Sequence, residues 1–89
     1  MKKRLFNYLV SIVHNNQKEN MMLQAHNMNE AKEKVLDVVM KSSIWNYKKN
    51  EFYLECYRIK VLEGGNYEII EFRRTGVKID FGHESVEML

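Results

Sequence analysis

The sequence has no proline, only four glycines and a single cysteine among its 89 residues. The lack of proline and the few glycines argue against a loop-rich scaffold. Cys56 cannot form an intramolecular disulfide, which favours a reducing, cytoplasmic compartment. No run approaches the roughly 20 apolar residues that a membrane-spanning helix needs. We therefore expect no membrane partner.

The N-terminus superficially resembles a secretory signal peptide, because three basic residues precede an apolar stretch at 5–13. Asn7, Tyr8 and Ser11 interrupt this stretch, however, and no small-residue cleavage site follows it. We reject the signal peptide and read the stretch as part of the fold.

The composition is that of an ordinary globule, with 45% hydrophobic and 29% charged residues. A chain of this length forms one domain, here 1–89, with a single modest core and no room for a deep enzyme cleft. The net charge is +2, from 14 basic and 12 acidic residues. This balance permits acidic or nucleic-acid partners without demanding them.

Three strands are predicted within 51–81, joined by turns at 63–66 and 74–77. A hairpin centred on Gly64-Gly65 uses the positive φ values that two-residue loops require. It places Tyr57 opposite Phe72 and Arg58 opposite Glu71. With a second turn at Thr75-Gly76, one apolar face results, and we expect the helix to cover it. That face consists of Tyr57, Ile59, Ile70, Phe72, Ile79 and Phe81.

The opposite face of these strands is predicted to be charged, with Arg73 beside Lys78 and Glu71 beside Asp80. Diagonal pairs of opposite charge could make this face an ordinary solvated lattice that contributes little. The alternative is a docking face for a partner. The candidate partner-binding residues on this hypothesis are Arg58, Tyr67, Glu71, Arg73, Lys78 and Asp80.

The first half of the chain predicts a hairpin followed by a helix. Residues 5–13 are apolar on both faces, which suits a central strand or one whose second face meets the C-terminal residues or another copy of the chain. A polar loop at 14–20, centred on Gln17-Lys18, leads to a short strand at 21–26. Asn27 and Glu30 predict a capping box at the helix start. The predicted apolar stripe of the helix contains Met28, Ala31, Val35, Val38 and Val39.

These elements predict an α+β fold. A mostly antiparallel sheet of about five strands carries one helix on one face, in the order ββαβββ. Residues 44–50, with Trp45 and Tyr47, are expected to connect the helix to the next strand and cap the core. Residues 83–89 are expected to form a tail that either frays or packs back on the domain.

No arrangement of side chains predicts catalysis, so we expect neither an enzyme nor a cofactor. Cys56 lies in a strand with no histidine in a predicted pairing beside it. The three histidines lack the close ligand spacing of a structural zinc site, so no metal is expected. Gly64-Gly65 is a turn without a following helix, and is therefore not a phosphate-binding loop.

Residues 25–31, Ala-His-Asn-Met-Asn-Glu-Ala, resemble the helix entry of many short bacterial and mobile-element proteins. In its small size, its abundance of Asn, Lys, Glu and Ile and its lack of a catalytic motif, the chain also resembles accessory proteins of phages of Gram-positive bacteria. The resemblance implies a non-catalytic module that binds and modulates a host enzyme, protease or defence complex. It transfers no functional residue.

The alternative function is binding of nucleic acid. Basic clusters at 2–4, 48–49 and at Arg58, Arg73 and Arg74 are interleaved with tyrosines, and sheets hold single strands by stacking and phosphate contacts. Most of these aromatics fall on the predicted inner face, which argues against this function. A homodimer is compatible with either function.

Overall fold

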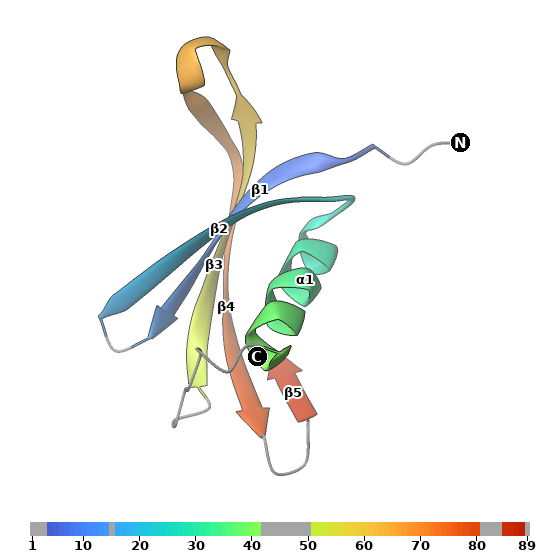
Figure 1. Cartoon of the computed structure of the whole chain (residues 1–89), viewed down its shortest axis with the longest axis vertical. Helices are drawn as coiled ribbons and strands as arrows, with labels where there is room; N and C mark the ends of the chain where they lie inside the picture. Colours follow the sequence, from blue (N-terminus) through green and yellow to red (C-terminus); the bar gives the residue numbers. More distant parts are fainter. Residues whose placement is uncertain (1–3, 15, 42–50, 81–84, 89) are drawn as a thin grey trace.

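The computed structural model describes residues 4–14, 16–41, 51–80 and 85–88, and it forms a five-stranded antiparallel sheet with one helix on one face (Figure 1). The strand order is β2-β1-β3-β4-β5. The α+β class and the order ββαβββ are confirmed. The elements are β1 (Phe6–His14), β2 (Gln17–Ala25), α1 (Met28–Lys41), β3 (Glu51–Val61), a 3-10 turn (Glu63–Gly65), β4 (Tyr67–Asp80) and β5 (Ser85–Met88).

Strand β1 is central, since it pairs with β2 on one side and β3 on the other. This position explains its apolar character on both faces. Tyr8, Val10 and Ile12 are buried in the core, whereas Leu9 and Val13 are half-buried on the opposite face. The prediction of a central strand is confirmed.

The first hairpin is tighter than predicted. His14 pairs with Gln17, so the loop contains only residues 15 and 16, and Asn16 has a φ of 65°. The predicted polar loop at 14–20 and its centre at Gln17-Lys18 are therefore wrong. Asparagine tolerates positive φ better than other non-glycine residues. The Asn-Asn pair was the missed turn signal.

Helix α1 begins directly after Asn27, the predicted capping residue. The Glu30 amide donates to Asn27 Oδ1 at 2.8 Å, and the Ala31 amide donates to the Asn27 carbonyl. Two ion pairs between residues four positions apart lie along the helix, with 3.3 Å between Glu30 and Lys34 and 3.0 Å between Asp37 and Lys41. The predicted stripe needs correction, because Lys32 and Leu36 are buried, whereas Val38 is 41% exposed. The buried face is thus rotated toward Lys32 and Leu36.

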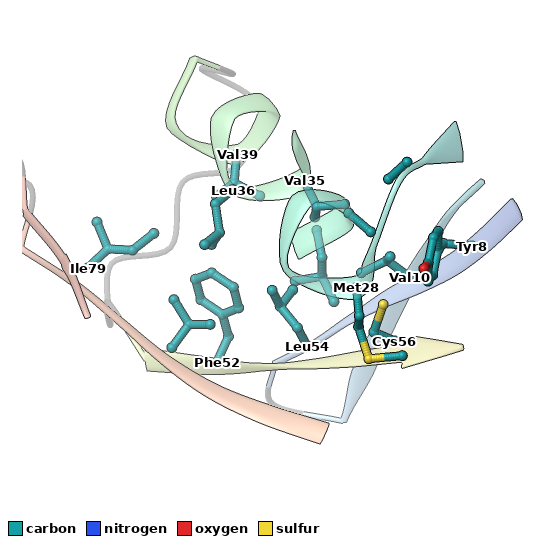
Figure 2. Close-up of a cluster of buried hydrophobic side chains, with 14 residues drawn as sticks. Tyr8, Val10, Met28, Val35, Leu36, Val39, Phe52, Leu54, Cys56 and Ile79 are labelled. Carbon is teal, nitrogen blue, oxygen red and sulfur yellow. The ribbon is translucent and has the colours of Figure 1, made fainter. Parts of the chain in front are cut away.

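The core lies between α1 and the face of the sheet that carries Phe52, Leu54 and Cys56 (Figure 2). In Figure 2, Tyr8 and Met28 lie toward one end of the core and Ile79 toward the other. The predicted inner face is therefore inverted. Of its members, Ile79 belongs to the core cluster, while Tyr57 and Phe72 lie on the face that α1 leaves open, here called the open face. Phe81 lies outside the described residues.

The inversion arises because β4 continues through Thr75 and Gly76 without turning. Among the described glycines, positive φ occurs only at Gly64 and Gly65. In one straight strand, Phe72 and Ile79 are seven positions apart and point to opposite faces. The predicted pairings of Arg73 with Lys78 and of Glu71 with Asp80 are therefore wrong. Arg73 pairs instead with Cys56, and Lys78 with Glu51 and Glu87.

The β3–β4 register agrees with the prediction in its middle and differs at its tip. Tyr57 pairs with Phe72 and Arg58 with Glu71, as predicted. At the tip the loop has three residues instead of two, and Val61 pairs with Tyr67. A bulge between Arg58 and Ile59 absorbs the difference of one residue. With such an extra residue, paired side chains before and after the bulge still lie on the same face of the sheet as their partners.

The C-terminal residues add the last strand, since β5 pairs with the end of β4, from Val77 with Met88 to Asp80 with Ser85. The segment expected as a fraying or packed tail is thus strand over 85–88. The connector with Trp45 and Tyr47 lies outside the described residues. In the described part of the chain, no helix is long and apolar enough to cross a membrane.

Candidate functional site

The end of the β3–β4 hairpin projects beyond the helix and the other strands (Figure 1). Strand β1 pairs with β3 only as far as Ile59, so the following residues lack its support. Every residue from 60 to 74 is exposed. We call residues 60–74 the arm.

The arm exposes several large apolar side chains among its charged ones. Tyr67 and Ile69 are each 53% exposed and Phe72 is 49% exposed. Val61, Leu62 and Ile70 are exposed as well. Single exposed apolar residues need no explanation, but a contiguous group of them marks an interaction site.

The outer edge of β4 is free along most of its length. Strand β5 pairs only with Val77–Asp80, and within the described residues no strand pairs with this edge between Tyr67 and Gly76. An unpaired edge presents a row of backbone donors and acceptors that can pair with another chain.

A hollow of about 340 Å³ lies on the open face at the base of the arm. Its apolar walls come from Leu9, Tyr57, Tyr67 and Ile69. The Tyr57 and Phe72 rings pack with their centroids 4.8 Å apart. The polar rim of the hollow contains Ser11, whose hydroxyl donates to Asn20 Oδ1 at 2.6 Å, together with Lys18. An apolar hollow with a polar rim suits an inserted apolar side chain.

The charges on the open face largely compensate one another. Lys18 lies 3.4 Å from Glu55, and Lys78 lies 4.0 Å from Glu51. The Arg74 guanidinium stacks over the Tyr53 ring at 4.2 Å. The open face is consequently aromatic and close to neutral.

The six predicted partner-binding residues do not share one surface. Arg58, Glu71 and Arg73 lie on the helix side of the sheet, around a groove at the start of α1. Tyr67 lines the hollow on the open face, and Lys78 lies on that face at the far end of β4. The backbone of Asp80 pairs with Ser85.

Phe72 was missed as a surface residue because it was assigned to the apolar face that the helix was expected to cover. Ile69 was not assigned to that face, but it was not named as a partner-binding residue either. The alternation of Phe52, Leu54 and Cys56 with Glu51, Tyr53 and Glu55 was the available signal. It shows which side of β3 is buried before the hairpin is reached.

Cys56 is fully buried in the core cluster. Its burial raises the pKa of the thiol from 9.0 to about 11, so the thiolate that a nucleophile requires does not form near neutral pH. Within the described residues, no group of three or more His, Cys, Asp or Glu side chains could hold a metal ion.

No known protein family, curated protein or solved structure matches this chain. Its function must therefore be inferred from its own surfaces.

Proposed function

We propose that this protein is a binding module that receives a strand of a partner protein along the free edge of β4. The observation that carries the proposal is the edge between Tyr67 and Gly76, which pairs with no strand among the described residues and which exposes Tyr67, Ile69, Ile70 and Phe72. In strand addition, backbone hydrogen bonds supply affinity and alternate side chains supply specificity. Here the partner strand extends the sheet, and one of its apolar side chains enters the hollow beside Tyr67 and Ile69.

Apolar burial supplies most of the binding energy in this proposal. An aromatic side chain buries about 150–250 Å², so covering a half-exposed ring removes about 100 Å² from water. At about 25 cal/mol per Å², each such residue contributes about 2.5 kcal/mol. Exposed ion pairs such as that of Lys78 with Glu51 contribute about 1 kcal/mol or less. Tyr67, Ile69 and Phe72 therefore dominate the interface.

The partner we propose is a bacterial host enzyme, protease or defence complex in the cytoplasm, which the module inhibits or modulates by covering its surface. The resemblance to phage accessory proteins motivates this choice.

A pull-down from a nuclease-treated Gram-positive bacterial lysate tests the proposal with two matched variants. The arm variant carries Ile69→Lys and Phe72→Lys. The control variant carries Met22→Lys and Val38→Lys, which adds the same charge at exposed apolar positions outside the arm. The wild type and the control should retain a stoichiometric host protein that the arm variant loses.

Hydrogen exchange of the resulting complex then tests the binding mode. Strand addition should protect backbone amides between Tyr67 and Gly76 that exchange freely in the isolated protein. Equal binding by the arm variant, or a complex without new protection in β4, would refute the proposed edge.

Nucleic-acid binding is the second candidate function, because Tyr53, Tyr57 and Phe72 lie on the open face and not in the core. Tyr53, Tyr57 and Phe72 could stack on bases beside Arg74. The acidic partners of Lys18 and Lys78 weaken this alternative. It predicts retention on heparin and an affinity for single strands that falls steeply with salt. Absence of retention, or affinity insensitive to salt, would exclude it.

A further inference from the structure

A groove of about 300 Å³ lies on the helix side of the sheet, at the start of α1. It brings together side chains from β1, β3 and β4 with the first turn of the helix. Its lining residues are Phe6, Tyr8, His26, Asn27, Met28, Asn29, Arg58, Glu71 and Arg73. The groove is separate from the hollow on the open face.

Positive charge exceeds negative charge around this groove. Arg58 and Arg73 line it. Lys32 lies near Arg73, and burial together with the positive charge of Arg73 lowers the pKa of Lys32. One carboxylate lines the groove, that of Glu71, 3.6 Å from Arg73 Nη2. The nearby Glu30 carboxylate is engaged by His26 at 2.9 Å and Lys34 at 3.3 Å. Among the side chains that line the groove, two guanidinium groups therefore face one carboxylate.

The start of α1 adds backbone donors. The first N–H groups of a helix have no intrahelical acceptor, and the helix dipole favours an anion there. The amides of Glu30 and Ala31 are satisfied by Asn27. The amides of Met28 and Asn29 precede them in the first turn, and both residues line the groove.

Tyr8 supplies an independent indication of a ligand. Its side chain is only 2% exposed, yet within the described residues its hydroxyl makes no hydrogen bond. No fully buried side-chain oxygen or nitrogen among those residues lacks a partner. The hydroxyl must therefore retain access to solvent, and the groove that Tyr8 lines provides it.

We propose that this groove binds a phosphate monoester through its terminal dianion. Two guanidinium groups, each able to donate two parallel N–H bonds, suit the oxygens of a phosphate dianion. The Arg58 guanidinium stacks over the Phe6 ring at 3.8 Å, which orients it and leaves its N–H groups for the ligand. Arg73, the Tyr8 hydroxyl and the first amides of α1 supply the remaining donors.

Titration of the ¹⁵N-labelled protein with inorganic phosphate, followed by NMR, tests the site. Saturable shifts should appear at the Met28 and Asn29 amides, and sodium chloride at matched ionic strength should not reproduce them. Adenosine 5′-monophosphate and O-phosphoserine carry the same dianion on different bodies, so the tightest of the three probes indicates the source of the phosphate. Linear shifts with all three probes, or equal shifts with chloride, would overturn the proposal.

Three variants test the assigned donors. Arg73→Gln should weaken phosphate binding at least about ten-fold, since a hydrogen bond to a charged group contributes about 1.5–3 kcal/mol. Tyr8→Phe should weaken binding while the ring stays packed, and Glu71→Gln should tighten it by removing a repulsive charge. Thermal melts establish that each variant is folded.

The arm variant separates this site from the proposed protein interface. It should bind phosphate like the wild type. Wild-type binding by Arg73→Gln and Tyr8→Phe, both folded, would refute the assignment of the groove even if the arm binds its partner as proposed.

Discussion

Lys32 places an ammonium group beneath helix α1, where it is 4% exposed and forms no ion pair within the described residues. Burial, reinforced by the charge of Arg73, lowers the pKa of Lys32 from 10.5. The folded state therefore binds this proton less tightly than the unfolded state does. The charged lysine destabilises the fold at neutral pH, and this penalty shrinks as pH rises toward 10.5.

We expect Lys32→Met to raise the melting temperature at pH 7 and to lose part of this advantage at pH 10. Methionine keeps much of the side-chain volume and needs no desolvation of a charge. Circular-dichroism melts of both proteins at the two pH values measure the difference. The Cys56 thiol, with its pKa of about 11, destabilises the fold above pH 9 in both proteins. Because the Lys32 charge lowers this pKa, the destabilisation is larger in Lys32→Met and adds to the loss of its advantage at pH 10.

Lys41→Met is the control, because Lys41 is exposed and its ion pair among the described residues, with Asp37, lies at the surface. Its effect should stay within about 0.5 kcal/mol. A lower melting temperature for Lys32→Met at pH 7 would contradict the assigned penalty. If Lys32→Met is more stable than the wild type but binds phosphate more weakly, phosphate binding explains why a lysine occupies position 32.

Helix α1 depends on one capping side chain at its start. Asn27→Ala removes the acceptor of the Glu30 amide and should lower the free energy of unfolding by about 1 kcal/mol. Urea denaturation measures this loss. Asn29→Ala removes the same side chain two residues later, inside the first turn, and should leave stability unchanged or slightly higher. Equal losses in the two variants would show that the cap has no special role.

The elements of this fold were predictable where a local signal determines them. Asn27 and Glu30 predicted the helix start, and Gly64-Gly65 predicted the β3–β4 hairpin. The register of Tyr57 with Phe72 followed from that hairpin, even though its loop is one residue longer than predicted.

The covered face was not predictable from the hairpin alone. Thr75-Gly76 resembles a turn, yet it continues a strand because β3 pairs with both residues. Lys32 was assigned to solvent because a lysine in a helix usually lies there. Both errors concern tertiary packing. The error about Thr75-Gly76 placed the candidate site on a charged lattice instead of on the arm.

In the part of the chain that the structure describes, α1 covers one face of the sheet and no layer covers the arm (Figure 1). Apolar strand edges of this kind pair readily with other chains. The net charge of +2 provides little repulsion between copies. In the absence of its partner, the protein should therefore associate with itself through the arm as its concentration rises.

Sedimentation velocity over a concentration series tests this prediction. The wild type should gain mass with concentration, whereas the arm variant should stay monomeric because two lysines oppose both apolar contact and strand pairing. The control variant gains the same net charge through Met22→Lys and Val38→Lys, so it should still associate. If arm and control variants dissociate equally, general charge repulsion governs association and the β4 edge is not the contact. If the wild type is monomeric throughout, the edge is too weak to pair with an identical strand, and a partner must add contacts of its own in the hollow beside Tyr67 and Ile69.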